Sequence, residues 1–353
     1  MNLKYFFALT AFAINTAAFG QEKTNSTPLQ ISGSADVYYK YDFAEQQNIK
    51  TSFDNDQNSV SLGMLDLILK KTTGKSSFVG EFSFGSRGQY GSIPNGDGDE
   101  LNSNNSTHIQ NLYMSYAFTD RLSATAGYMS TFIGYEVITP TGNYNYSTSY
   151  LFTNGPFQNG GIKANYVISS KVAVMVGLFN DWNVYKDVNG VSHFGAQLAL
   201  TPVEGWIANL NVLTGQVTGI PENGSIYDLT TTYQLNDAVK LGLNAADYSI
   251  TNDKGGYSGL ALYFQNAFNA SISAGLRGEY FKSKSSSDGL TLSGVTPGES
   301  VFGLTLTANV KSGGLTFIPE VRLDKASSKQ FLDKQLAPDK KAAQFSLAAV
   351  YAF

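Results

Sequence analysis

The sequence predicts an all-β fold, a transmembrane antiparallel β-barrel of about sixteen strands. Apolar and polar residues alternate with a period of two in short blocks, as in strands that place each face in a different environment. Short turns and long polar loops separate these blocks in regular alternation. No segment after the N-terminal leader holds the roughly 18 uninterrupted apolar residues of a membrane-spanning helix.

The composition excludes several kinds of functional site. The 353 residues include no cysteine, which excludes disulfides, cysteine-bound zinc, iron–sulfur clusters and thiol nucleophiles. The net charge is −4 and the sequence has no basic cluster, so it does not predict a positively charged surface that would bind nucleic acid. Charged residues make up only 15% of the chain, below the quarter or so that is usual for a soluble domain. We expect no cofactor.

The first twenty residues read as a cleaved signal peptide. Lys4 precedes an apolar stretch, and the small-residue pattern Ala18-Phe19-Gly20 follows it. We therefore expect a signal peptide at 1–20, a short periplasmic segment at 21–28 and the barrel at 29–353. Export in a Gram-negative bacterium would place such a barrel in the outer membrane.

Alternation defines each expected strand. In the first block, Val37 and Tyr39 share one face, while Asp36 and Lys40 share the other. The same pattern recurs sixteen times, an even number. The expected strands are 29–43, 59–71, 76–90, 107–118, 121–131, 159–168, 171–181, 191–201, 205–215, 225–235, 238–250, 257–267, 269–282, 299–310, 314–324 and 342–353.

Loop lengths favour a membrane barrel over a soluble sandwich. Short turns, among them 266–268, alternate with long polar loops, an asymmetry that a sandwich has no reason to show. The long loops are expected at 44–58, 91–106, 132–158, 182–190, 216–224, 251–256, 283–298 and 325–341.

A barrel of about sixteen strands encloses water, so the polar row of each strand should face inward. This row carries charges of both signs, and ion selectivity does not follow from the mixture. We expect Arg277 with Glu279, and Glu320 with Arg322, to serve in ordinary pairs with neighbouring strands. The charged inward candidates are Asp36, Lys40, Glu81, Arg87, Lys163, Lys240, Arg277, Glu279, Glu320 and Arg322.

Aromatic residues gather near both ends of the strands, where amphipathic rings would meet the lipid headgroups. Two girdles are therefore expected. They comprise Tyr39, Tyr41, Phe43, Tyr128, Tyr257 and Tyr280 toward the long loops, and Phe118, Tyr166, Trp206, Tyr233, Tyr351 and Phe353 toward the short turns.

Two regions carry a resemblance to a known family. The last strand alternates to a terminal Phe353, which looks like the signal read by the barrel assembly machinery. The run 132–164 contains Gly134-Tyr135-Glu136, then Asn145-Tyr146-Ser147-Thr148-Ser149, then Gly160-Gly161. This run resembles the OmpL-like family of β-barrel porins, and the resemblance implies an outer-membrane diffusion channel.

The third long loop, 132–158, gives the candidate pore site. General porins with a similar plan fold this loop into the lumen as a constriction. We expect Glu136 to face the pore and set a negative charge at the narrowest level. The alternative is that Glu136 bonds to the inner wall and anchors the loop.

Other motifs are weaker. Residues 54–58 and 95–100 are rich in oxygen ligands but lack the glycine and glutamate of a calcium loop. His108, expected on the outward face, and His193, expected on the inward face, have no serine motif or acidic partner nearby in sequence, so we expect no enzyme. The last long loop carries Lys325, Lys329, Lys334, Lys340 and Lys341, a patch that could attract anionic solutes or lipopolysaccharide phosphates, although a solvated loop is the simpler interpretation.

These patterns predict a porin that lets small hydrophilic solutes or ions diffuse passively through a lumen narrowed by the loop at 132–158. The competing interpretation is a surface barrel that does not transport and acts as an adhesin, receptor or structural protein through its long loops. Expected partners are outer-membrane lipids, lipopolysaccharide and the solutes, and wide barrels of this type often associate as homotrimers.

Overall fold

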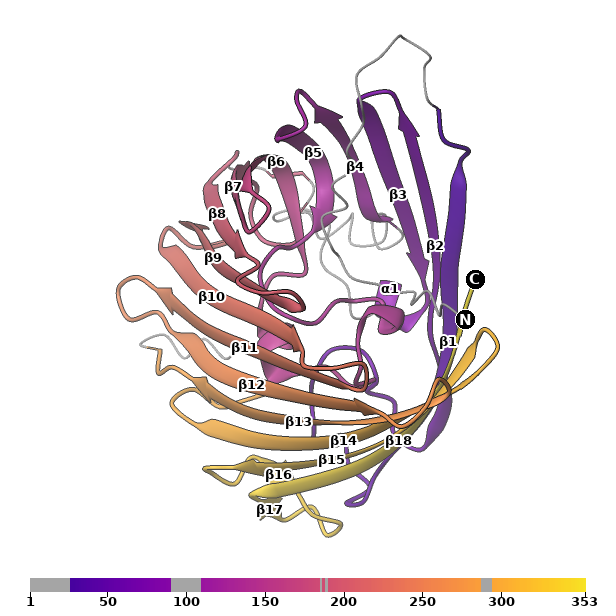
Figure 1. The fold of residues 1–353 in the computed structure, drawn as a ribbon. Coiled ribbons are helices and arrows are strands. Elements are labelled where there is room, and N and C mark those ends of the chain that lie inside the picture. Colours follow the sequence, from indigo (N-terminus) through magenta and orange to yellow (C-terminus); the bar gives the residue numbers. More distant parts are fainter. Residues whose placement is uncertain (1–25, 90–108, 185, 188–189, 287–293) are drawn as a thin grey trace.

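The computed structural model describes residues 26–89, 109–184, 186–187, 190–286 and 294–353. Within them, sixteen antiparallel strands close into a barrel in which the first and last strands of the chain are neighbours (Figure 1). The predicted sixteen-stranded barrel is confirmed. Its strands are β1 (Gln30–Asp42), β2 (Ser59–Thr73), β3 (Ser76–Phe84), β4 (Ile109–Ala117), β5 (Leu122–Ser130), β6 (Gln158–Ser169), β7 (Val172–Phe179), β8 (His193–Leu200), β9 (Trp206–Gln216), β10 (Asn223–Gln234), β11 (Val239–Ile250), β12 (Gly256–Ala267), β13 (Ile272–Ser283), β14 (Ser300–Ser312), β15 (Leu315–Ala326) and β18 (Lys341–Ala352).

Three local differences from the predicted elements have physical reasons. The strand predicted to reach residue 90 ends at Phe84, because Gly85 adopts a positive φ of 104° and the chain turns into the short helix α1 (Ser86–Gln89). The turn predicted at 266–268 lies at 268–271, since Ala267 still pairs with Ser273. The last long loop contains the small hairpin β16 (Phe331–Leu332) and β17 (Pro338–Asp339).

Several predictions fall outside the described residues. They are the signal peptide at 1–20, the acidic run at 95–100 and His108. In the part of the chain that is described, no helix is long and apolar enough to cross a membrane.

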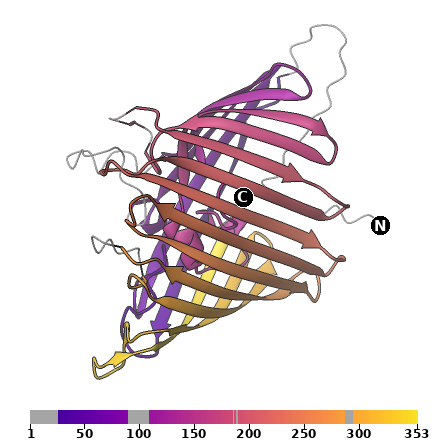
Figure 2. The same ribbon diagram turned by 90° about the vertical axis from the view of Figure 1, so that its left-hand side faces the viewer.

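The two faces of each strand differ in polarity, as the alternation predicts. On β13, Arg277 and Glu279 are each 1% exposed, whereas Leu276 just before them and Tyr280 just after them are 41% and 47% exposed. The exposed row belongs to the outer wall of the barrel, whose strands are seen from the side in Figure 2. Large apolar side chains on an outer wall are stable in contact with lipid, and the polar row lines the interior.

The aromatic girdles are largely outward-facing, with one correction. Phe43, Phe118 and Tyr351 are each about half exposed on the outer wall. Tyr257, predicted to lie in the girdle, is instead 1% exposed and packs inside the barrel, with its ring 5.4 Å from that of Phe281. Tyr257 follows two glycines with positive φ at the start of β12, where parity counted from the sequence is unreliable.

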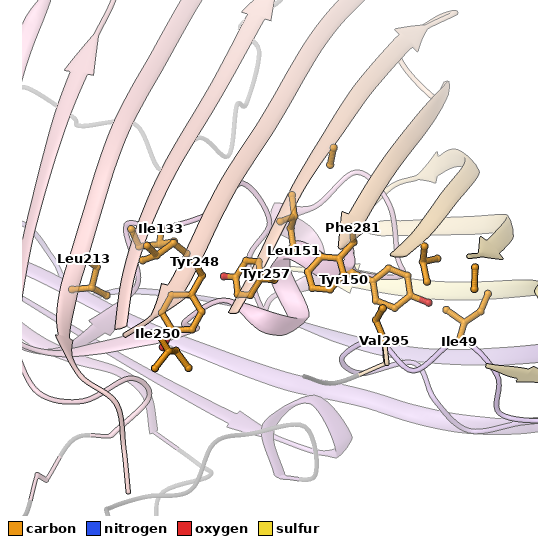
Figure 3. Packing of buried hydrophobic residues seen from close by; sticks show 14 of the residues in the cluster. Ile49, Ile133, Tyr150, Leu151, Leu213, Tyr248, Ile250, Tyr257, Phe281 and Val295 are labelled. Carbon is orange, nitrogen blue, oxygen red and sulfur yellow. The ribbon is translucent and has the colours of Figure 1, made fainter. Parts of the chain in front are cut away.

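An apolar cluster fills part of the interior near the long-loop ends. It joins Tyr257 and Phe281 of the wall to Tyr150 and Leu151, which lie in the segment between β5 and β6 (Figure 3). Ile49, from the segment between β1 and β2, belongs to the same cluster. Two long loops therefore pack inside the barrel rather than extending away from it. We call residues 43–58 loop 1 and residues 131–157 loop 3.

Candidate functional site

Loop 3 is attached to the inner wall at its short helix α2 (Tyr150–Asn154). The backbone N–H groups of Tyr150 and Leu151 each donate a 2.9 Å hydrogen bond to the Glu279 carboxylate on β13. Ser149 caps the same helix by accepting from Phe152 N. The first N–H groups of a helix have no partner within the helix and carry partial positive charge, so a carboxylate is well placed there.

A second wall carboxylate binds the loop farther along. Glu320 on β15 accepts from the backbone N–H groups of Tyr146 and Ser147, at 2.9 and 3.1 Å. Farther around the wall, three strands beyond β13, Asp228 of β10 accepts from Gly134 N at 3.1 Å. The loop backbone is thus bonded to three separate strands.

Glu136 of loop 3 bonds both to the wall and to another part of the same loop. Its Oε1 is 2.7 Å from Arg277 Nη1 and accepts a 3.2 Å bond from the Tyr263 hydroxyl. Its Oε2 accepts from Ser149 N at 2.7 Å, and Arg277 also donates to the Ser147 carbonyl. Glu136 is 7% exposed, so both of its oxygens face protein groups.

The prediction that Arg277 and Arg322 pair with residues of neighbouring strands is wrong. Arg277 pairs with Glu136 of loop 3, and Arg322 pairs with Asp324, two residues along its own strand, at 2.9 Å. Arg322 also donates to the Thr148 carbonyl at 2.8 Å. The reason is the position of loop 3. Its backbone N–H and C=O groups lie inside the barrel and need hydrogen-bond partners, so the wall charges bond to the loop.

Arg87 joins three segments. It lies on α1 rather than on the strand predicted for it, and it donates to the carbonyls of Ile138 and Tyr146. Its guanidinium lies 4.9 Å from the Phe53 ring of loop 1 and 4.5 Å from the Tyr146 ring of loop 3. The Tyr146 hydroxyl donates to Asp36 on β1 at 2.5 Å.

Glycines of the inner wall make room for the aromatic side chains of loop 3. A Cβ added at Gly242 would lie 2.3 Å from the Tyr135 hydroxyl oxygen, and one at Gly275 would lie 2.3 Å from the Tyr144 ring. Tyr135 also stacks on Tyr263 of β12, with ring centroids 4.3 Å apart. The wall and the loop are therefore matched in shape as well as in hydrogen bonding.

The remaining predicted residues separate into two groups. Glu81 accepts from the Thr139 hydroxyl of loop 3 at 3.3 Å, and Lys40 is buried on β1 close to Asp42 and Asp54. Lys163 and Lys240 are only partly buried on the inner faces of β6 and β11. Among the described residues, no ion pair involves either of these two lysines.

Sequence reasoning missed Asp228 and Asp324, both of which bond to loop 3. Asp324 accepts from the Tyr150 hydroxyl at 2.8 Å. Asp324 shares the inward parity of Arg322, which was predicted to face inward, and Asp228 shares that of the buried Thr230 on its own strand. The alternation of inward and outward residues along each strand could therefore have identified both aspartates. Nothing in the sequence indicates the wall glycines.

His193 has polar neighbours but no catalytic arrangement. Its Nδ1 is 2.9 Å from the Ser192 hydroxyl and 3.4 Å from Asp181. A catalytic triad needs serine and carboxylate on opposite ring nitrogens, and here both lie at the same one. Across the described residues, no group of three or more histidines and carboxylates is placed to hold a metal ion, the oxygen-rich run at 54–58 included.

A family model described as "Putative beta-barrel porin-2, OmpL-like" matches residues 28–353. The chain belongs to this family of β-barrel porins. The match covers the entire predicted barrel, well beyond the 132–164 run that suggested it. None of the curated proteins is similar enough in sequence to count as a relative.

Solved porin structures share the fold of this OmpL-like barrel at low sequence identity. The outer membrane channel DcaP of Acinetobacter baumannii has a TM-score of 0.60 at 13% identity, over 96% of this chain and 100% of that one. The anion-selective porin from Comamonas acidovorans has a TM-score of 0.60 at 11% identity, over 93% and 100%. OmpT of Vibrio cholerae in its trimer form has a TM-score of 0.57 at 11% identity, over 93% and 99%.

Proposed function

We propose that this OmpL-like porin lets small hydrophilic solutes or ions diffuse passively through a water-filled lumen, and that loop 3 narrows the passage. The observation that carries the proposal is the attachment of loop 3 to inward-facing side chains of several strands, above all Glu279, Glu320 and Asp228. A loop held at so many points reduces the open cross-section by a fixed amount. Solutes would then be separated by size.

The charges along the passage would modulate this size exclusion. Glu136, Arg87, Arg277, Glu279, Glu320 and Arg322 are each bonded to loop 3 or belong to it, so we propose an anchoring role for them. Lys163 and Lys240 lie on the wall without such bonds, and we propose that they face the solute path. Asp36 and Glu81 also bond to loop 3, through the hydroxyls of Tyr146 and Thr139, and Lys40 is buried close to Asp42 and Asp54. We therefore propose that these three residues support the loop rather than face the solute path.

Two further partners belong to this proposal. The likeness to a trimeric OmpT is consistent with a homotrimer of this chain. The terminal Phe353, exposed on the outer wall at the end of β18, would be the residue recognised by the barrel assembly machinery.

Single-channel recording in planar bilayers tests the proposal. Val137 and Asn143 are joined by two hydrogen bonds, from Val137 N to Asn143 Oδ1 at 2.9 Å and from Asn143 Nδ2 to the Val137 carbonyl at 2.6 Å. Replacing residues 138–142 by two glycines therefore shortens loop 3 at a point where its ends already meet. We expect a larger conductance and a larger size limit for sugars in liposome swelling.

The matched control replaces the tip Asn252-Asp253-Lys254, whose first two residues are exposed, by two glycines, which should leave conductance unchanged. Absence of any open-channel current from correctly folded, heat-modifiable wild-type protein would contradict the porin proposal. That result would favour the surface-protein alternative, in which the long loops act as an adhesin or receptor.

A further inference from the structure

A groove on the outer wall near the long-loop end is formed by the last hairpin and the strands beside it. It has a volume of about 600 Å³. The hairpin β16–β17 contributes Leu332 and Gln335, and the barrel wall contributes outward-facing side chains of β14, β15 and β18, with Phe43 just beyond β1. The groove thus lies on the side of the barrel that contacts lipid.

The floor of the groove is apolar. Leu304, Leu323 and Ala343 are direct neighbours across three adjacent strands, and Phe43 bonds to Ala343 through its backbone N–H. The small Ala343 lies between larger side chains, which leaves a furrow along the wall. Leu323 and Phe43 are 50% and 48% exposed, so the furrow is uncovered.

Two lysines lie at the edge of this floor. On the outer face they form the next cross-strand pair after Leu323 and Ala343, toward the long loops. Lys325 and Lys341 are direct cross-strand partners on β15 and β18, and both are exposed on the outer face. Like charges placed directly opposite each other destabilise a sheet. Within the described residues neither forms an ion pair, whereas Lys334 in the same groove is bonded to Glu45 at 2.8 Å.

None of the nearby carboxylates that the structure describes is paired with these two lysines. Asp333 accepts from the backbone N–H groups of Gln335 and Ala337 within the hairpin, and Asp339 accepts from Lys340 N. Asp324 points inward and is bonded to Arg322. The two facing ammonium groups therefore form a site for an anion, directly beside an apolar furrow.

We propose that this groove binds lipopolysaccharide of the outer leaflet, with a lipid A phosphate between Lys325 and Lys341 and acyl chains along the furrow. The floor extends over four neighbouring strands, roughly 14 Å at about 4.8 Å per step. Such a width suits the several parallel acyl chains of a glycolipid better than the two chains of a phospholipid. The proposal does not depend on whether the lumen conducts.

Native mass spectrometry of the full-length barrel in detergent tests the site, with diphosphoryl lipid A, monophosphoryl lipid A and phosphatidylglycerol as probes. A lysine near an anionic membrane surface contributes about a five-fold change in binding. We therefore expect the double variant Lys325→Gln/Lys341→Gln to bind diphosphoryl lipid A about thirty-fold more weakly. Lys329→Gln, in the segment that connects β15 to β18 but outside the groove, should bind like the wild type.

A second variant tests the furrow separately. Ala343→Phe fills the floor without changing charge, and we expect it also to lose affinity for lipid A, while heat-modifiable migration on gels confirms that the barrel is folded. Wild-type affinity of the double lysine variant would overturn the proposal. So would equally tight binding of phosphatidylglycerol and diphosphoryl lipid A, since that result indicates a general anionic surface.

Discussion

Glu136 and Arg277 form a buried ion pair, with side-chain exposures of 5% and 1%. Removing one partner of a buried pair is costly because the other charge remains without compensation, typically about 3 to 5 kcal/mol. At this position the cost would fall on the attachment of loop 3, since Arg277 also holds the Ser147 carbonyl and Glu136 also holds Ser149 N.

We predict that Glu136→Gln lowers the free energy of unfolding by about 3 kcal/mol and increases closures of the channel current, because Arg277 is left unpaired. The reversal potential in a salt gradient should stay unchanged if Glu136 anchors the loop. Urea unfolding and planar-bilayer recordings measure the two effects. Glu204→Gln, in an exposed short turn, is the control. A loss of cation preference with unchanged stability would instead place Glu136 in the pore.

At the scale of elements, the strands were predictable from the alternation. The entry of loop 3 into the lumen was expected only from the likeness to general porins, and its contacts were not predictable. Each side chain of a strand faces either lipid or lumen, and the resulting alternation can be read from a short stretch of sequence. For this reason β1 and β13 lie within a few residues of their predicted bounds. Loop 3 depends on contacts such as those of Tyr146 with Glu320 and of Tyr150 with Glu279. These partners lie more than a hundred residues apart, and no periodicity encodes them.

Loop 1 contains a carboxyl group that links its position to pH. Asp54 is buried inside the barrel, and this burial raises the pKa of its carboxyl to about 6, with Lys40 opposing the rise and Glu320 adding to it. A pKa raised by folding means that the folded protein binds the proton more tightly than the unfolded chain. Stability from this group is therefore present at low pH and is lost as the pH rises through 6.

We predict that loop 1 opens more often at pH 7 than at pH 5. Hydrogen exchange of the amides in residues 43–58 measures this opening, after correction for the intrinsic pH dependence of exchange. Asp54→Asn removes the titrating group and should give the same protection at both pH values. Equal protection in the wild type at pH 5 and pH 7 would show that Asp54 does not control the loop.

At the scale of the whole molecule, stability depends on closure between the first and last strands. Gly33 and Phe353 exchange two backbone hydrogen bonds of 3.0 Å, which join β1 to the end of the chain. Closure removes the free edges of the sheet, and a barrel in lipid cannot leave them unpaired. The chain has no disulfide to replace this function.

We predict that Gly33→Ala weakens closure, because the added Cβ would lie 2.1 Å from the Asp66 carbonyl oxygen and 2.8 Å from the Phe353 ring. Overpacking of this kind costs about 1 to 3 kcal/mol. We expect a smaller folded fraction after refolding into detergent and loss of the heat-modifiable band at a lower temperature.

Gly278→Ala is the control, since a Cβ there meets nothing within 4 Å. Removing the ring with Phe353→Ala in the Gly33→Ala background relieves only one of the two contacts, so it should restore stability only in part. If the Gly33→Ala and Gly278→Ala variants lose the heat-modifiable band at the same temperature, the closing strands tolerate the added methyl group. Closure would then depend on the rest of the β1–β18 pairing.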